Sequence, residues 1–378
     1  MTDLYWEILP FKERIMKTVK FIGDDPAQKE FGHAVRRNVH AYFKAKDLST
    51  KGGVRMIGKA FLILGIYLIP FVLLLVFPVG IWAALALVIV MGIGEAGVGM
   101  GVMHDAVHGA FSEKKWVNEV FGFSMYAMGS NTFNWKIQHN LLHHTFTNIE
   151  GMDEDIETKA VIRLCEHTPL KKYHRFQYLY AYFLYGLMTL SKFVTDIAQL
   201  IDFNRTGITR EQHKNPRLEL FKLVLTKIIY LFVVIGLPLW FTSYAWWQIL
   251  IGFCLMHVTA GIIMSTVFQM AHVVEGTEQP LPDNKGVVHN EWAVHELHTT
   301  SDFGRHNLLL NWYVGGLNFQ IEHHLFPHTC HLHYRKIAPI VQQTALEFGI
   351  PYNLKPSLRA AFISHTKRLR ALGRPLNG

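Results

Sequence analysis

Residues 59–103 read KAFLILGIYLIPFVLLLVFPVGIWAALALVIVMGIGEAGVGMGVM, and this stretch determines the fold. Lys59 to Phe77 is apolar apart from its first residue and Tyr67, and a bilayer core needs about 20 such residues to be crossed. Pro78-Val79-Gly80 then breaks the helix, and Ile81 to Met103 supplies a second apolar segment. The stretch therefore predicts two membrane-spanning helices joined by a short turn.

A second pair of apolar segments runs roughly from Leu223 to Phe241 and from Trp246 to Phe268. The link within each pair is only a few residues long. The chain has 378 residues, of which 50% are hydrophobic, and a mean hydropathy of +0.16. We therefore predict an all-α polytopic membrane protein with four transmembrane helices in two hairpins. Two aromatic, amphipathic segments, Phe176 to Leu200 and Trp116 to Phe133, are expected to lie in the membrane interface.

The distribution of lysine and arginine predicts the orientation in the membrane. The residues before Lys59 include eleven of them, from Lys12 to Arg55, whereas the turns around Val79 and Tyr244 have none. Cytoplasmic loops carry the excess of positive charge, so both termini are expected on the cytoplasmic side. We expect one domain over 1–378, with these parts: a basic cytoplasmic segment (1–58), the first hairpin (59–103), a cytoplasmic and interfacial segment (104–222), the second hairpin (223–268) and a cytoplasmic cap (269–378).

Charge and cysteine content limit the remaining possibilities. The net charge of +8 suits anionic lipid headgroups or an acidic protein partner, although the cytoplasmic charge bias alone accounts for it equally well. Three cysteines without zinc or redox spacing predict free thiols. Residues 1–20 have no apolar run typical of a signal peptide. We expect a lipid bilayer as a partner and no nucleic acid.

Three histidine clusters carry the chemistry. They read His104-Asp-Ala-Val-His108, His139-Asn-Leu-Leu-His143-His144 and Gln320-Ile-Glu-His323-His324. Imidazole suits first-row transition metals, and seven imidazoles exceed the four ligands of one tetrahedral zinc. The clusters therefore predict two metal ions bound almost entirely through nitrogen.

Their position relative to the spans is as informative as their number. The second span runs directly into His104, and the fourth runs on to His272 just past its end. Residues four apart lie on one face of a helix, so His104 and His108 should project together, as should His139 and His143, with His144 beside them. A metal centre at the cytoplasmic ends of the spans could then reach a lipid chain. Taken alone, His104 and His108 are equally consistent with surface histidines or a single zinc site, and Gln320 to His324 are ambiguous. The second cluster favours metal binding, because adjacent histidines after a pair four residues apart have no simple packing role.

Two features inside the spans have structural interpretations. Glu95 is ionisable within the second span and so functional by default, although a hydrogen-bonded packing role is slightly favoured, as it is for His257 in the fourth span. Five glycines between positions 92 and 101 would let another helix or an acyl chain approach closely.

With these motifs, the chain resembles membrane fatty acid desaturases with three histidine boxes. The resemblance extends from about Phe31 to Tyr352 and includes the stretch from His143 through Thr147-Asn148 to Asp153-Glu154-Asp155-Ile156. Its most specific part is Asn318-Phe319-Gln320-Ile321-Glu322-His323-His324-Leu325-Phe326-Pro327. Glutamine at the first position of the third box is similar to the front-end (Δ5/Δ6-type) branch and to related bacterial acyl desaturases.

The resemblance implies two iron ions as cofactors and O2 as co-substrate. It implies these histidine ligands, together with Gln320 at a ligand position: His104, His108, His139, His143, His144, His272, His323 and His324. Carboxylates should orient the imidazoles, and the candidates nearest in sequence are Asp105, Glu322, Asp153 and Asp155. Helix capping or solvation is an equally good interpretation of Asp153 and Asp155.

The chain departs from the family pattern at two points. Eukaryotic front-end members carry a fused cytochrome b5 domain with a His-Pro-Gly-Gly motif. This motif is missing from the sequence. A separate protein, either a ferredoxin or a cytochrome b5 with its reductase, is therefore expected to supply electrons. Acyl-CoA Δ9 members have an asparagine one turn before the histidine equivalent to His272, where this chain has Phe268 beside Gln269.

The expected activity is O2-dependent insertion of a cis double bond into a fatty acyl chain, carried as acyl-CoA or acyl-lipid. The expected location is a bacterial inner membrane rather than the endoplasmic reticulum. A hydroxylase or acetylenase would use the same ligands. From a different class, a metal transporter would spread its ligands along a path through the membrane, and a zinc hydrolase would need a His-Glu-x-x-His motif that is missing here.

Overall fold

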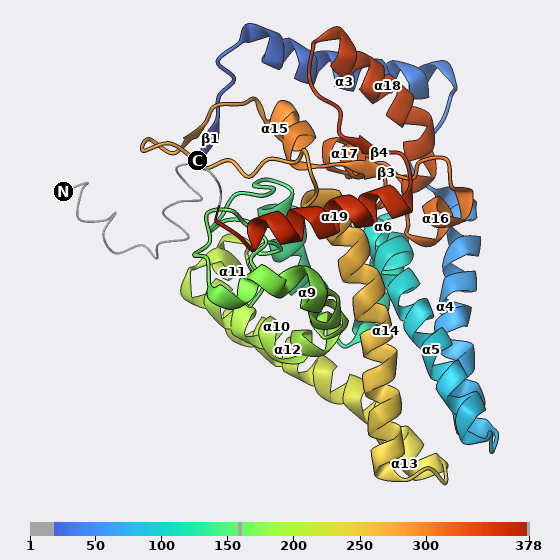
Figure 1. Ribbon diagram of the computed structural model, residues 1–378. Coiled ribbons are helices and arrows are strands. Elements are labelled where there is room, and N and C mark those ends of the chain that lie inside the picture. Colours follow the sequence, from blue (N-terminus) through green and yellow to red (C-terminus); the bar gives the residue numbers. More distant parts are fainter. Residues whose placement is uncertain (1–18, 158–160, 376–378) are drawn as a thin grey trace.

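The computed structural model describes residues 19–157 and 161–375, and in these the predicted all-α fold is confirmed (Figure 1). Within residues 19–157 and 161–375, strand structure is limited to two parallel pairs of two-residue strands. β1 (Lys20–Phe21) pairs with β2 (Val287–Val288), and β3 (Asp302–Phe303) pairs with β4 (Leu354–Lys355). Each pair ties a segment from one end of the chain to the region around the third histidine cluster.

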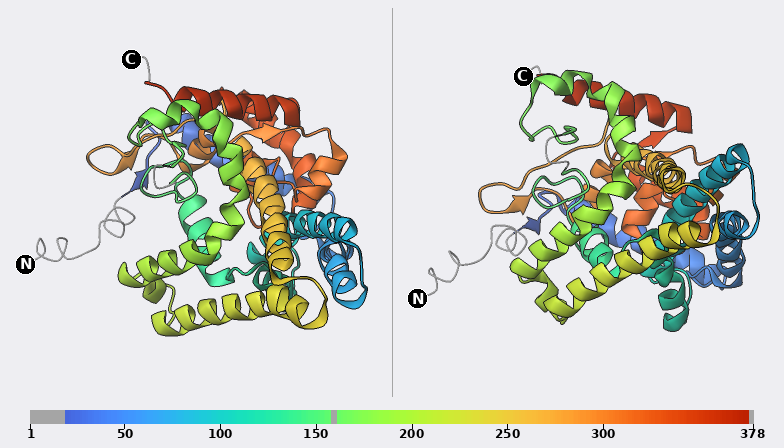
Figure 2. Two further views of the ribbon diagram at one scale, coloured as in Figure 1. Left: turned by 60° about the horizontal axis from the view of Figure 1, so that its bottom comes forward. Right: turned by 90° about the horizontal axis from the view of Figure 1, so that it is seen from below.

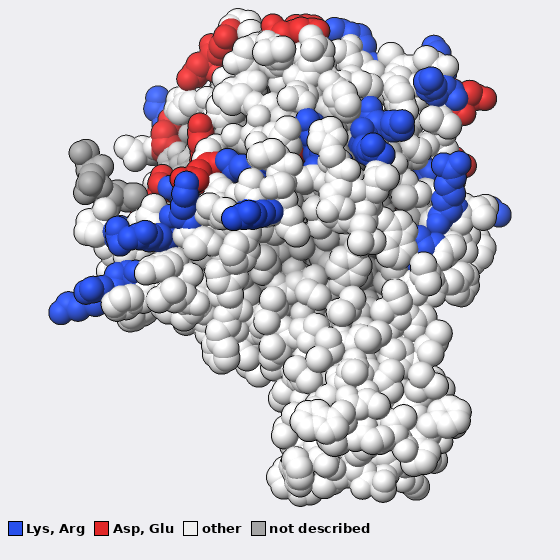
Figure 3. All heavy atoms as spheres, turned by 45° about the vertical axis from the view of Figure 1, so that its right-hand side comes forward, with Lys and Arg blue, Asp and Glu red and all other residues white. Residues whose placement is uncertain are grey.

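In the described part of the chain, four helices are long and apolar enough to cross a membrane, as predicted. The segments are Gly53–Val76, Ile81–Val107, Pro216–Phe241 and Trp246–His272. The first is α4 and the last is α14 (Trp246–His272). The second consists of α5 (Ile81–Val98), η1 (Gly99–Met103) and α6 (His104–Val107), and the third of α12 (Pro216–Leu231), η5 (Phe232–Gly236) and α13 (Leu237–Phe241). On the face shown in Figure 3, the lower part of the molecule carries no charged side chain, which suits a lipid environment.

Helix α5 is the centre of the membrane part because glycines allow two neighbours to approach it. A Cβ on Gly94 would lie 2.5 Å from the backbone nitrogen of Tyr67 in α4, and one on Gly92 would lie 2.5 Å from the carbonyl oxygen of Met256 in α14. The expectation that these glycines admit another helix is therefore confirmed. Helix α12 instead packs on α10. The third span contacts α14 through Tyr230 at the end of α12, through η5 and through α13. In the view from below, the third span crosses the picture while α14 is seen nearly end-on (Figure 2).

The segment between the second and third spans contains several short helices. The expected interfacial helix from 176 to 200 is in fact two helices separated by Leu187. The elements are α7 (Lys115–Gly122), η2 (Phe123–Met128), α8 (Thr132–Trp135), η3 (Lys136–His143), η4 (Lys172–Phe176), α9 (Gln177–Gly186), α10 (Met188–Arg205) and α11 (Ile208–Glu211).

Helices α3, α15, α17 and α18 form a compact unit above the spans, which we call the cap (Figure 1). On α3, Phe31, Val35, Val39 and Phe43 repeat every four residues and pack against the other three helices. The cap core thereby fixes α17, which carries the third histidine cluster. The four cap helices are α3 (Pro26–Ala45), α15 (Trp292–Thr299), α17 (Gln320–Leu325) and α18 (Tyr334–Glu347). The other elements of this region are α16 (Leu308–Tyr313), η6 (His331–His333) and α19 (Leu358–Leu372).

Candidate metal centre

One group of four histidines gathers where the second span meets the cap. Its members are His104 and His108 from α6, His139 from η3 and His323 from α17, and one ring nitrogen of each lies within 4.8 Å of the others. The Nε2 atoms of His104 and His139 are 3.2 Å apart. Residues predicted from separate clusters are thus brought into one buried group.

A second group lies beside the first. It contains His143 from η3, His272 from the end of α14 and His324 from α17. The side-chain nitrogen of Gln320 is 2.9 Å from Nε2 of His272 and 3.3 Å from Nε2 of His324, so this amide belongs to the second group. His144 lies at the boundary, because its Nε2 is 3.3 Å from that of His139 while its ring is 4.4 Å from the ring of His324.

The second histidine cluster of the sequence, His139 to His144, lies on a π-helix and not on the α-helix that its spacing predicts. The backbone N–H of His144 donates to the carbonyl of His139 at 3.1 Å, an i→i+5 bond. This wider turn places His139, His143 and His144 on one side, whereas an α-helix would rotate the third of them away. A second π-helix, η1, ends directly before His104.

The ring nitrogens are suited to metal ions. Nε2 of His108, His143 and His323 is buried without a hydrogen-bond partner among the described residues. Burial, reinforced by the neighbouring histidines, lowers the pKa of His108, His139, His144, His323 and His324 well below the ordinary value. These rings are therefore neutral at pH 7, with lone pairs directed into a shared space, which fits first-row transition metals.

Asp153 and Asp155 lie against His143. Both carboxylate oxygens of Asp153 are 3.1 Å from Nδ1 of His143, and Oδ2 of Asp155 is 3.5 Å away. Burial alone would lower the pKa of His143, but the charge and hydrogen bond of Asp153 outweigh it and raise that pKa to about 9. Asp153 is itself fixed by the backbone N–H of Asn148 at 2.8 Å. A carboxylate on Nδ1 leaves Nε2 as the metal-facing atom.

The other two predicted carboxylates have different partners. Asp105 lies 2.8 Å from Nδ1 of His331 and only 3.9 Å from Nδ1 of His104, while Nε2 of His331 is 2.7 Å from the amine of Lys59. Glu322 accepts a hydrogen bond from Tyr352 at 2.8 Å and has no described hydrogen bond to a histidine. Among the described residues the carboxylate of Glu322 therefore contacts Tyr352 and no imidazole, so no contact supports the expected orienting role.

The structure identifies supporting residues that the sequence did not. Oε2 of Glu296, from α15, is 2.7 Å from Nδ1 of His324 and accepts a hydrogen bond from Thr147 at 3.0 Å. Trp135 stacks on His139 with ring centroids 4.2 Å apart. The run His295-Glu296-Leu297-His298 was the available signal for Glu296, since it places an acid between histidines shortly before the third cluster.

Phe268 forms an apolar wall at the position of the family's asparagine. Its ring centroid is 5.1 Å from that of His143 and 4.9 Å from that of His272. The neighbouring Gln269 points elsewhere and donates to the carbonyl of Asp155 at 3.2 Å. Deeper in the spans, Nε2 of His257 is 2.9 Å from the hydroxyl of Tyr230, as expected for a hydrogen-bonded packing residue. Its Nδ1 is 3.3 Å from Oε1 of Glu95, but the carboxylate of Glu95 has no hydrogen bond among the described residues.

The three cysteines, Cys165, Cys254 and Cys330, are free, as predicted. Cys330 lies with Asp105 and His331 in a third group of possible ligands. In this group Nε2 of His331 already has the amine of Lys59 as a neighbour, so the group is an ion-pair network.

Comparison with known proteins agrees with this geometry. The family model for fatty acid desaturases matches residues 80–356. The sn-1 linoleoyl-lipid 6-desaturase of Arthrospira platensis is 33% identical over 342 residues, covering 90% of this chain and 92% of the relative. The enzyme of the same name from Synechocystis sp. is 33% identical, covering 92% and 96%, and an acyl-lipid (8-3)-desaturase of Physcomitrium patens is 31% identical, covering 92% and 73%.

The matched region includes all three histidine clusters and every member of the two histidine groups. The match extends over most of the chain, and the cited relatives exceed 30% identity over about nine-tenths of it. The chain belongs to the fatty acid desaturase family and is thus an oxidoreductase of lipid metabolism.

Proposed function

We propose that the protein is an O2-dependent di-iron desaturase that inserts a cis double bond into a fatty acyl chain. The observation that carries the proposal is the pair of adjacent, buried histidine groups, each with ring nitrogens within 4.8 Å of one another, at the ends of apolar spans. We treat 1–378 as a single desaturase domain with the parts predicted above. Residues 1–18 and 376–378 lie outside the described structure.

Eight histidines and one glutamine would hold the metals. One iron would be bound by His104, His108, His139, His144 and His323, and the other by His143, His272 and His324, with Gln320 as a further ligand. When bound by these residues, the metals would supply the O2 activation that is needed to remove hydrogen from unactivated methylene carbons. Asp153 and Glu296 would hold the rings of His143 and His324 in orientation, and Phe268 and Trp135 would exclude water from the metal-facing side.

The substrate we propose is an acyl chain of a membrane lipid, with the double bond inserted near the carboxyl end. The relatives named above are called linoleoyl-lipid or acyl-lipid desaturases, which supports a lipid-linked chain as the substrate. An apolar cavity between α4, α5 and the third span, lined by Phe71, Met91, Tyr230 and Val234, offers space for hydrocarbon. An acyl-CoA remains the second candidate carrier.

We place the metal centre on the cytoplasmic side of a bacterial inner membrane. Lys51, Arg55 and Lys59 lie at the same end of the first span as the histidines, and positive charge at span ends marks the cytoplasmic side. Electrons would come from a separate protein, a ferredoxin or a cytochrome b5 with its reductase.

Product analysis tests the proposal. A bacterial host expressing the chain and fed linoleate should accumulate a fatty acid with one additional cis double bond, detected by gas chromatography–mass spectrometry of the lipid fraction. His143→Ala, which removes a member of the second group, should abolish the product. A hydroxylated or acetylenic chain in place of the new double bond would favour the related activities, and metal uptake without any new fatty acid would favour a transporter.

A further inference from the structure

A cluster of cations lies at one end of the cap, around His333. It combines the end of α3, the start of α4 and the first turn of α18. Its members are the exposed Lys44, Lys46, Arg55, Arg335 and Lys336 and the half-buried Lys51, and we call them the His333 cluster. In the segments that supply it, 44–55 and 333–336, Asp47 is the single acidic residue. So high a density of one charge on a folded surface favours an oppositely charged partner.

The contacts of His333 hold these segments together. Its ring packs edge-on against Phe43 of α3 with centroids 5.1 Å apart, and its Nε2 is 3.3 Å from the carbonyl oxygen of Lys51. Leu48 and Leu332 are 45% and 36% exposed within the same segments. Apolar side chains inside a ring of charge are typical of a protein-docking surface.

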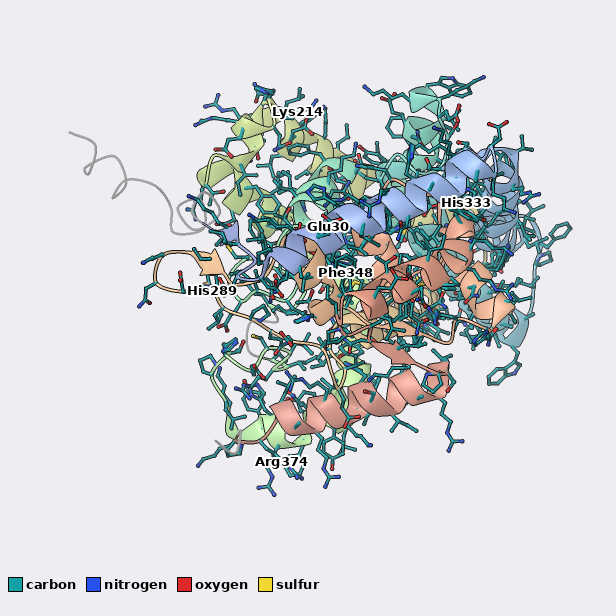
Figure 4. All side chains as sticks on the ribbon, turned by 90° about the horizontal axis from the view of Figure 1, so that it is seen from above. Glu30, Lys214, His289, His333, Phe348 and Arg374 are labelled. Atoms are coloured by element: carbon teal, nitrogen blue, oxygen red, sulfur yellow. The ribbon has the colours of Figure 1, made fainter. Side chains whose placement is uncertain are left out.

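The opposite end of the cap has a mixed charge. Asp24, Asp25 and Glu30 lie at the start of α3, close to the loop that carries Asp283 and His289, and the exposed cations Lys29 and Lys285 lie among them. Viewed from above, Glu30 and His289 lie at one end of the cap and His333 at the other (Figure 4). This difference in charge between the two ends would orient an acidic protein toward the His333 cluster.

The His333 cluster also lies over a short route to the candidate metal ligands. Tyr334 follows His333 directly, is buried, and places its hydroxyl 3.2 Å from Nδ1 of His323. The amine of Lys51 donates to the carbonyls of Gly109 and His328, both at 2.9 Å, and Nδ1 of His328 is 2.7 Å from the carbonyl of His108. A carrier docked here would therefore be separated by few residues from His108 and His323, two members of the first histidine group.

We propose that the His333 cluster is the docking surface for a small acidic one-electron carrier protein. This inference rests on the proposed function, whose balance requires such a carrier: –CH2–CH2– + O2 + two electrons + two protons gives –CH=CH– + two waters. Two reduced carriers would each deliver one electron in succession.

The basic residues of α19 are interpreted differently from those of the His333 cluster. Arg359 and Lys367 flank exposed Phe362 and Ile363, a pattern suited to the membrane surface.

Binding provides a test that is independent of turnover. The full chain in phosphatidylcholine nanodiscs is titrated with a plant-type ferredoxin and with a soluble cytochrome b5 domain, by biolayer interferometry. At least one carrier should bind, less tightly as salt increases, and Arg335→Glu with Lys336→Glu should weaken binding by about tenfold or more. Arg335→Gln with Lys336→Gln should have an intermediate effect.

The matched control is Lys29→Glu with Lys285→Glu. This pair makes the same charge change on exposed cations at the opposite end of the cap, and binding should stay within about twofold of the unaltered protein. The proposal is overturned if neither carrier binds, if both double reversals weaken binding equally, or if the α18 reversal has no effect.

A turnover measurement separates docking from damage to the metal centre. With dithionite-reduced methyl viologen, which needs no docking site, the α18 reversal should form product at the unaltered rate, while its KM for the protein carrier increases. Equal loss with both reductants would overturn the docking assignment. Absence of product from the unaltered chain with every reductant would refute the proposed function, leaving the binding titration to decide the docking surface.

Discussion

At the scale of single residues, the carboxylates show what sequence proximity can and cannot predict. Asp153 was predicted from its position ten residues after His143, and it does contact that ring. Glu296 was missed because its partner, His324, lies 28 residues away and the contact depends on α15 packing against α17. Glu322 is next to His323 in sequence, yet its hydrogen bond goes to Tyr352. Neighbouring residues on a short helix point in different directions, so adjacency alone does not predict contact.

Two buried glutamates provide a matched test of this distinction. Burial raises the pKa of both Glu296 and Glu322 well above the ordinary value, but only Glu296 touches a histidine. Glu296→Gln should weaken iron binding at the second group by about 10- to 100-fold, because the amide that replaces the carboxyl group is a weaker acceptor for Nδ1 of His324. Glu322→Gln should retain its iron.

The two variants are compared by their iron content per chain. It is measured by inductively coupled plasma mass spectrometry after dialysis against a chelator. Circular dichroism of both variants checks that the helices are intact. The orienting role of Glu296 is refuted if its variant keeps as much iron as Glu322→Gln.

At the scale of elements, the sequence predicted which helices exist better than where they begin. The first span begins at Gly53 and not at Lys59, because the apolar pattern starts only after Arg55 whereas the helix includes that residue. Lys59 lies within the helix and is buried against His331. The third begins at Pro216, where Asn215 caps the helix by accepting from the backbone N–H groups of Arg217 and Leu218. The π-helices left no pattern in the sequence, since a four-residue spacing of histidines suggests an α-helix.

Helix α5 makes a prediction at this scale. Gly94→Ala forces a methyl group against the backbone of α4 and should lower the free energy of unfolding by about 1–3 kcal/mol. Gly58→Ala, in α4 with no atom within 4 Å of the new methyl, should be neutral or stabilising by up to about 1 kcal/mol. Thermal unfolding in one detergent compares them. A Gly94→Ala protein as stable as the unaltered chain would contradict the close contact between α4 and α5.

At the scale of the whole molecule, the chain combines an apolar bundle with a polar cap, and the histidines lie where the two meet. The bundle was predictable from hydropathy, and the family resemblance supplied His272 as a member of the site. The division of the histidines into two groups was not predictable, because each group draws on three parts of the chain far apart in sequence. That division depends on cap packing, which a single sequence does not reveal.

The central claim is that these two histidine groups hold two iron ions. The measurement that tests it most directly is the metal content of the purified chain, expressed with iron, zinc and copper all supplied. We predict two irons per chain, one for each group, falling to about one in His272→Ala, which belongs to the second group alone. A chain that carries a single zinc, or no tightly bound metal, would contradict the claim.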